Sequence, residues 1–290
     1  MIKIPISINE LNSYFQAMTE IKELKIGGQK AVYTANHKIF GAVVLKLIPD
    51  DTQDQRILRE IEIVRLNKFP NVPVIYEVGK IETSIGNFLH IIEQRIFGED
   101  LRSLIELQGK LSFPVVIKFL ESLLATVVEL EKKNIVHRDI KPDNILYETE
   151  KCFWLIDFGI ARDMDKVSLT ATNAHFGPFS AGYAPPEQFQ NMKRLIDSRA
   201  DLFAIGVTAY EMLHGKNPFL TGARGAIDVL MRTATLVEDP LKITEDTHNE
   251  LSAFIKTLMQ KNPTFRPPSA AMALLWFREI TKTLTLEATP

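Results

Sequence analysis

The spacing of hydrophobic residues changes character near residue 98. Before that point, short runs rich in β-branched residues and bounded by polar turns predict strands over residues 26–35, 42–48, 75–81 and 88–94. Within the same part, apolar residues three and four positions apart predict one helix over residues 52–66. The first part of the chain is therefore predicted to be mainly β-sheet.

Helical periodicity dominates after Gly98. Ser112 and Pro114 predict the start of a long helix, and Gly215 predicts the end of a second one over residues 199–214. The change of pattern around residues 94–100 predicts two lobes, strand-rich over residues 1–94 and helical over residues 95–290. We therefore expect an α+β fold with a cleft between a small β-rich lobe and a larger helical lobe.

Composition adds few constraints to this layout. The chain of 290 residues is 46% hydrophobic and 24% charged, and its formal net charge of −2 gives no electrostatic reason to expect a nucleic-acid partner. One cysteine, Cys152, excludes an intramolecular disulfide and favours a reducing compartment. The start of the chain has no signal-peptide core, and no apolar run is long enough to span a bilayer. These features predict a cytoplasmic protein without a membrane segment.

Two acids and an amide carry the strongest chemical signal. Residues 136–146 read VHRDIKPDNIL and residues 155–159 read LIDFG, which places Asp139, Asn144 and Asp157 between apolar runs. Phosphoryl transfer needs such a set, because a carboxylate orients the incoming hydroxyl and oxygen ligands hold the cations that bridge phosphates. The order and spacing of these residues resemble the catalytic loop and the metal-binding loop of protein kinases.

This resemblance implies a role for each polar residue of the two loops. Asp139 would orient the substrate hydroxyl and accept its proton, and Lys141 would steady the transferring γ-phosphoryl group, as is typical of serine/threonine kinases. Asn144 and Asp157 would hold Mg²⁺, with Mn²⁺ as an alternative. His137 would be a structural residue of the core.

Lys46 lies in the otherwise apolar run 43–48 and needs a partner, since a buried unpaired charge is unfavourable. Glu60 shares a helical face with Ile57 and Val64, which makes it the expected partner. By resemblance, Lys46 would hold the α- and β-phosphates of ATP while Glu60 holds the lysine. The alternative is an edge-strand lysine that points to solvent.

The phosphate-binding loop departs from the family pattern. Aligning Val32 with the valine of G-x-G-x-x-G-x-V puts Lys25, Gly27 and Lys30 at the three glycine positions, with Gly28 beside the middle one. Gly27 and Gly28 would let backbone N–H groups approach the phosphates. A plain hairpin turn fits the same residues equally well.

Residues 92–101 resemble the linker that docks adenine in protein kinases. The resemblance implies that Ile92 is the gatekeeper, that the carbonyl of Glu93 and the backbone groups of Arg95 bond the base, and that Glu99 bonds the ribose. An exposed loop with scattered charge is the alternative for Glu99.

Later landmarks extend the resemblance from about residue 26 to residue 267. Ser180 takes the position of a hydroxyl that bonds the catalytic aspartate and lysine. Glu187 is expected to pair with Arg266, and Asp201 is expected to cap the catalytic loop. All three follow from the family pattern.

The expected function is that of an ATP-dependent serine/threonine protein kinase, which phosphorylates Ser and Thr hydroxyls of proteins and also itself. A pseudokinase that only binds partners, or a small-molecule phosphotransferase of similar fold, remain as alternatives. The candidate acceptors in the activation segment are Ser168, Thr170 and Thr172, whose phosphate would bond Arg138.

Overall fold

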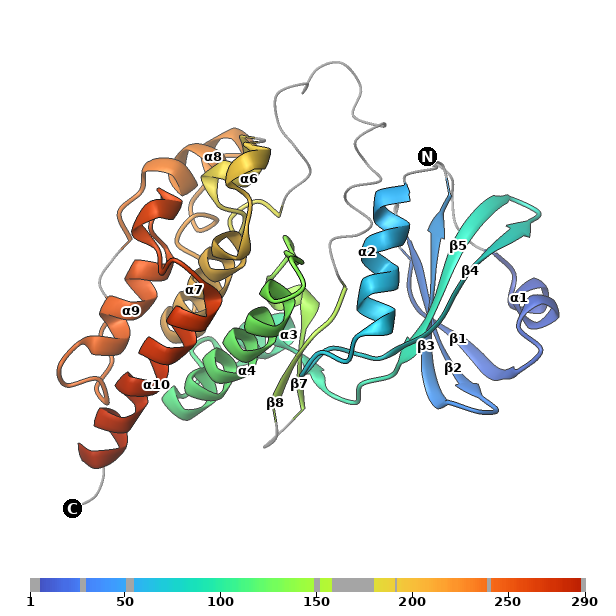
Figure 1. The fold of residues 1–290 in the computed structure, drawn as a ribbon, viewed down its shortest axis with the longest axis horizontal. Helices are drawn as coiled ribbons and strands as arrows, with labels where there is room; N and C mark the ends of the chain where they lie inside the picture. Colours follow the sequence, from blue (N-terminus) through green and yellow to red (C-terminus); the bar gives the residue numbers. More distant parts are fainter. Residues whose placement is uncertain are drawn as a thin grey trace. The chain divides into compact units, whose positions relative to one another are not determined.

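The computed structural model describes residues 6–26, 30–50, 55–148, 152–157, 180–190, 192–238 and 241–287, and it describes no side chains for residues 26, 55–60, 193 and 285–287 (Figure 1). Contacts within the chain divide it into two units. The described part of the first unit comprises residues 6–26, 30–50, 55–68 and 73–97, and the second comprises residues 69–72 and all described residues from Gly98 onward. Each unit has its own hydrophobic core.

The first unit is an antiparallel sheet of five strands in the order β1-β2-β3-β5-β4. Its strands are β1 (Met18–Ile26), β2 (Ala31–His37), β3 (Gly41–Pro49), β4 (Ile75–Thr83) and β5 (Gly86–Gln94), and its helices are α1 (Ile8–Tyr14) and α2 (Gln55–Leu66). The predictions of strands over 42–48, 75–81 and 88–94 are confirmed. The prediction of one strand over 26–35 was wrong in its start, because β1 ends at Ile26 and β2 begins at Ala31.

The two faces of this sheet differ, since successive side chains of a strand point to opposite sides. Leu45 and Leu47 of β3 belong to one core cluster with Ile92 of β5 and Leu11 of α1. Lys46 lies between the two leucines in sequence and therefore faces the other side of the sheet. The pairing of β3 with β5 thus decides which residues of β5 share a face with this lysine.

The second unit is mostly helical. Its helices are α3 (Leu101–Gln108), α4 (Phe113–Glu131), α6 (Pro186–Phe189), α7 (Ser198–His214), α8 (Ala226–Thr235), α9 (Glu250–Leu258) and α10 (Ala270–Glu287), and its 3-10 helices are Pro142–Asn144, Lys193–Leu195 and Pro263–Phe265. A small sheet of β6 (Glu99–Asp100), β7 (Ile145–Glu148) and β8 (Cys152–Leu155) packs beside α4. Figure 1 shows α10 running alongside α4 and α9, which both contact it.

Helix α7 is the central element of this unit. The side chain of Asp197 accepts a hydrogen bond from the backbone N–H of Arg199 at the start of the helix. Gly215 ends it with a left-handed backbone at φ 80°, a conformation that costs glycine little. The predicted helix over 199–214 is therefore confirmed, and it brings Asp201 into the core of the unit at 1% exposure.

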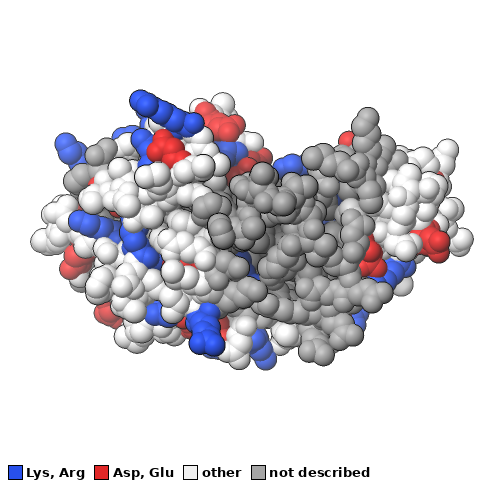
Figure 2. Space-filling view, turned by 90° about the horizontal axis from the view of Figure 1, so that it is seen from above, with Lys and Arg blue, Asp and Glu red and all other residues white. Residues whose placement is uncertain are grey.

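Among the described residues on the face drawn in Figure 2, basic and acidic side chains are interspersed. Among the described helices, none is both long and apolar enough to cross a membrane.

Candidate active site

The catalytic loop follows α4 and is hydrogen-bonded to Asp201 of α7. Both carboxylate oxygens of Asp201 accept backbone hydrogen bonds, from His137 N at 2.8 Å and from Arg138 N at 2.9 Å. Burial raises the pKa of Asp201 to about 6, while the two backbone bonds act in the opposite direction. The predicted cap of the loop by Asp201 is therefore present, and it holds the backbone just before Asp139.

Arg138 has a left-handed backbone at φ 65°, which is unfavourable for a residue with a side chain. The side-chain amide of Gln188 in α6 donates to its carbonyl oxygen at 2.8 Å. Asp201 accepts from the backbone N–H of Arg138 and Gln188 donates to its backbone oxygen, so both backbone polar groups of this strained residue are hydrogen-bonded. Sequence reasoning missed Gln188, although it directly follows the predicted pairing residue Glu187.

Asp139, Lys141 and Ser180 form one bonded group. The hydroxyl of Ser180 donates to Asp139 Oδ1 at 2.7 Å and accepts from Lys141 Nζ at 3.0 Å. Lys141 Nζ also lies 3.4 Å from Asp139 Oδ2. The predicted bridging position of Ser180 is thus observed, and it joins a residue 41 positions away in sequence to the neighbouring side chains of Asp139 and Lys141.

Asn144 closes the 3-10 turn that follows Lys141. Its Nδ2 donates to both the backbone oxygen and the Oδ2 of Asp139, each at 2.8 Å. Its own backbone oxygen accepts from Ile156 N at 2.9 Å, so the residue before Asp157 is bonded directly to Asn144. Asp157 has a left-handed backbone at φ 58°. The two predicted metal ligands therefore lie on neighbouring, hydrogen-bonded segments.

The donor set of these segments fits a hard divalent cation. Because Asn144 donates through its nitrogen, its side-chain oxygen is the atom suited to a metal, and Asp157 adds a carboxylate. Within the described ranges no group of three or more His, Cys, Asp or Glu residues is placed to hold a metal ion. A small protein donor set is what Mg²⁺ uses when substrate phosphates complete its coordination.

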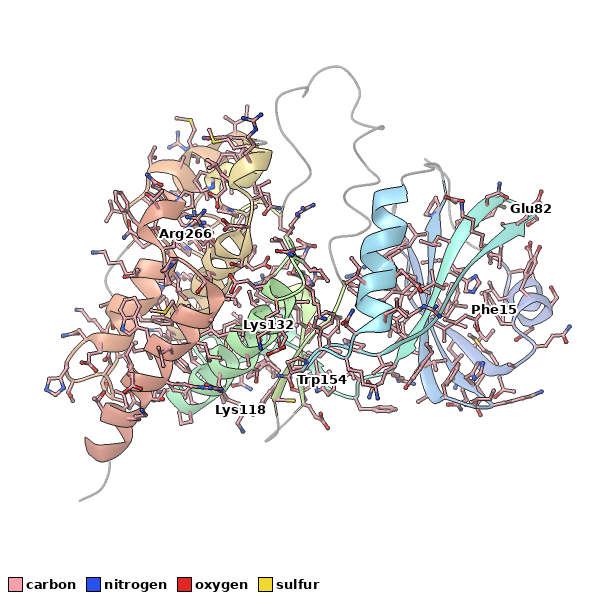
Figure 3. The ribbon with its side chains drawn as sticks, viewed as in Figure 1. Phe15, Glu82, Lys118, Lys132, Trp154 and Arg266 are labelled. Carbon is pink, nitrogen blue, oxygen red and sulfur yellow. The ribbon has the colours of Figure 1, made fainter. Side chains whose placement is uncertain are left out.

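The predicted pair of Glu187 and Arg266 is also present, and it is buried (Figure 3 labels Arg266). Arg266 NH1 lies 2.6 Å from Glu187 Oε1, and NH2 lies 3.1 Å from Oε2, which is a two-point contact. The guanidinium also donates to the backbone oxygens of Gln260, Lys261 and Arg199. This pair ties the segment after Ser180 to the turn before α10.

A second buried polar group lies next to the catalytic loop and was not predicted. Arg102 of α3 donates to Glu211 at 2.8 Å and to the hydroxyl of Tyr183 at 2.5 Å, and that hydroxyl donates to Glu211 at 2.5 Å. Arg102 also lies 3.5 Å from Asp143 of the loop. Burial raises the pKa of Tyr183 well above its ordinary value, so the phenol stays protonated as a donor.

In the sheet unit, Lys46 pairs with Glu93. The distance from Lys46 Nζ to Glu93 Oε1 is 2.5 Å, and both side chains are buried. The side chain of Glu60 lies outside the described residues, so its predicted contact with Lys46 stays a prediction. Ile92, the expected gatekeeper, faces the opposite core with Leu45. The register between β3 and β5 instead puts Glu93 on the face of Lys46, and the gatekeeper role of Ile92 stays a prediction.

The structure describes only some of the other residues that were predicted to contact the nucleotide. The backbone N–H of Arg95 donates to the oxygen of Ala42 at 3.3 Å, so this donor is already used within the sheet. Val32 is buried and lies opposite Lys46 in the ladder between β2 and β3. Glu99 is exposed in β6. Outside the described residues lie Gly27, Gly28 and the candidate acceptors Ser168, Thr170 and Thr172.

The fold and the loop together have the arrangement of a protein kinase domain. The protein kinase domain family matches residues 18–277, and the chain belongs to this family. The predicted family and its α+β fold, an antiparallel sheet followed by a mostly helical region, are therefore confirmed.

Curated relatives agree with this assignment. A probable serine/threonine-protein kinase of Clostridium acetobutylicum is 29% identical over 86% of this chain and 37% of its own length. The serine/threonine-protein kinase PknB of Mycobacterium leprae is 29% identical over 86% of this chain and 40% of its own length. A probable serine/threonine-protein kinase of Clostridium perfringens is 30% identical over 84% and 35%, respectively. The chain thus spans well under half the length of these relatives.

Proposed function

We propose that this chain is an active serine/threonine protein kinase domain. It transfers the γ-phosphate of ATP to Ser and Thr hydroxyls of proteins, including its own. The observation that carries the proposal is the bonded group of Asp139, Lys141 and Ser180, which sets a carboxylate and a cation side by side. The names of the similar bacterial proteins, all serine/threonine-protein kinases, support the same substrate class.

In this proposal, Asp139 binds the hydroxyl group of the Ser or Thr residue that accepts the phosphate. Its carboxylate accepts the hydroxyl proton as the oxygen attacks phosphorus, which is the task of a positioned general base. Lys141 contacts the same carboxylate and balances negative charge on the transferring phosphoryl group. Ser180 holds both side chains in place, so little reorganisation is needed at the moment of transfer.

Asn144 and Asp157 would hold Mg²⁺, with Mn²⁺ as a substitute. When bound, such a cation neutralises the phosphate oxygens and fixes their orientation. The bond between Asn144 and the segment that leads into Asp157 keeps the two ligands together in the absence of metal.

The sheet unit supplies the nucleotide contacts. Lys46 would hold the phosphates with help from a carboxylate, and Val32 would pack against the base. The proposal assigns the remaining contacts with ATP to Gly27, Gly28, Glu93, Arg95 and Glu99, and it keeps Glu60 as a residue that holds Lys46. With two of the three glycine positions lost, we expect modest ATP affinity that depends on Mg²⁺.

The proposed substrates are proteins with accessible Ser or Thr residues, and the proposed compartment is the cytoplasm. The single cysteine supports a reducing compartment.

The test compares two aspartate variants of the same loop. Asp139→Asn removes the proposed base, whereas Asp143→Asn makes the same change at a carboxylate that is 43% exposed. Each purified protein is incubated with labelled ATP, Mg²⁺ and a generic protein substrate, and phosphoamino acids are then analysed. We expect phosphoserine and phosphothreonine from wild type and Asp143→Asn, and a loss of roughly 10²–10⁴-fold in folded Asp139→Asn. Wild-type transfer in folded Asp139→Asn would contradict the proposal.

A further inference from the structure

Lys46 and Glu93 form a buried ion pair across two neighbouring strands. In the ladder between β3 and β5, Val44 lies opposite Glu93 and Lys46 lies opposite Ile91, so the pair is diagonal. Diagonal neighbours on one face are within reach of long side chains. The exposed fraction is 7% for Lys46 and 8% for Glu93, which means that water screens the pair little.

The carboxylate of this pair is held by regular β-structure. Gln94 N donates to Val74 O at 2.8 Å and Arg95 N donates to Ala42 O at 3.3 Å, so the backbone after Glu93 is bonded on both sides. The backbone of Glu93 therefore cannot move away from Lys46 without breaking hydrogen bonds of the sheet. A partner on a separate helix would lack this restraint, because its distance follows every shift of the helix.

An ammonium group has three N–H donors. A contact of one donor with Glu93 is therefore compatible with contacts of other donors with phosphate oxygens. The pair therefore suits a lysine that must be charged and oriented before an anionic ligand arrives, since its buried charge is balanced in the absence of that ligand.

We propose that Glu93 is a positioning residue for Lys46, so that the nucleotide-binding lysine is oriented from within the sheet. The inference deepens the proposed function and rests on it, because Lys46 is taken to hold the phosphates of ATP. It assigns to the Glu93 side chain a role separate from any contact of its backbone with the base. An ion pair that serves stability alone is the competing explanation.

The first experiment measures kcat and the KM for ATP in three variants. Glu93→Gln keeps the shape of the side chain and removes its charge, and Glu93→Asp keeps the charge. Glu77→Gln is the matched control, because Glu77 lies on the neighbouring strand β4, is 49% exposed and contacts His90 on the other face of the sheet. We expect Glu93→Gln to lower kcat about tenfold or more, since misplaced reacting groups lose transfer rate before binding. Glu93→Asp recovers part of this loss, and Glu77→Gln stays near wild type.

The second experiment is a double-mutant cycle on affinity for ATP with Mg²⁺, measured by calorimetry in wild type, Lys46→Met, Glu93→Gln and the double variant. If Glu93 acts through Lys46, Glu93→Gln weakens binding only where Lys46 is present. We expect removal of both charges of the pair to be tolerated better than removal of one.

Two results would overturn the inference: wild-type kcat in folded Glu93→Gln, or an equal loss of affinity with and without Lys46. A wild-type protein that binds ATP without transferring phosphate would contradict the proposed function alone, since the affinity cycle still reports on Glu93. A wild-type protein that binds no ATP would contradict both.

Discussion

The catalytic loop and the lysine strand are two polar regions built in opposite ways. The loop is irregular and has a left-handed residue at Arg138, and the segment bonded to it has another at Asp157. It is held by bonds from side chains to the backbone, from Asp201 in α7 and Gln188 in α6. Lys46, in contrast, lies in a regular antiparallel ladder and is oriented by an ion pair on the next strand.

The difference shows how much local sequence each kind of structure requires. An irregular loop needs a particular side chain at almost every position, because each strained or unpaired backbone group must find its own partner. A strand satisfies its backbone through the ladder, so only register decides which side chains meet. The loop can therefore be recognised in the sequence as a motif, whereas the pairing of Lys46 with Glu93 cannot.

The largest effect is expected from removing the carboxylate of Asp157, on the segment that is hydrogen-bonded to the catalytic loop. Asp157→Asn should lower phosphoryl transfer by roughly 10²–10⁴-fold, since the proposed Mg²⁺ loses a charged ligand and the phosphate charge is no longer neutralised. Labelled-ATP assays check the rate, and circular dichroism checks that the fold survives. Transfer close to wild type would mean that the loop does not depend on this ligand.

The next prediction concerns the buried ion pair of Glu187 and Arg266. Glu187→Gln should lower the free energy of unfolding by about 3–5 kcal/mol, because Arg266 is then left buried with its charge unbalanced. The matched control is Glu121→Gln, whose partner Arg278 is 53% exposed, and it should lose less than about 1 kcal/mol. Urea denaturation measures both. Equal losses would show that burial does not distinguish the two pairs.

A pH-dependent effect is expected from the carboxylate that caps the loop. Asp201 binds its proton more tightly in the folded state, so its contribution to stability is full below pH 3.8 and is lost as the pH rises through about 6. A rise of the pKa from 3.8 to about 6 corresponds to about 3 kcal/mol. The stability advantage of wild type over Asp201→Asn should therefore shrink by up to this amount between pH 4 and pH 7.

Urea denaturation of both proteins at several pH values tests this linkage. A gap between them that stays constant over the range would show that Asp201 is ionised throughout.

The smallest effect is expected at the hydroxyl that joins Asp139 to Lys141. Ser180→Ala removes two hydrogen bonds to charged groups and should lower transfer roughly tenfold, with a loss of stability of about 1.5–3 kcal/mol. Ser180→Thr keeps the hydroxyl and should retain most of the rate. Steady-state assays of both variants check this order, and equal rates in the two would remove Ser180 from the positioning of the loop.

Several elements were predictable because their signals are local. Helix α7 has a capping aspartate before it and a glycine after it, and the strand over 42–48 is a run of apolar residues. Strand β1 was missed, because Lys22, Glu23 and Lys25 give it an exposed, charged pattern at the edge of the sheet. The position of Gln188 was missed as well, since no spacing rule links it to Arg138.

The sequence by itself determined which polar residues meet in the catalytic loop, Asp139, Lys141 and Asn144, because they lie within one short segment whose spacing limits their geometry. Only the tertiary structure decided that Glu93 rather than Ile92 shares a face with Lys46, since a change of one residue in a strand moves a side chain to the opposite face. It also decided the meeting of Arg102, Tyr183 and Glu211. Packing of separate elements brings them together, and no local spacing records that contact.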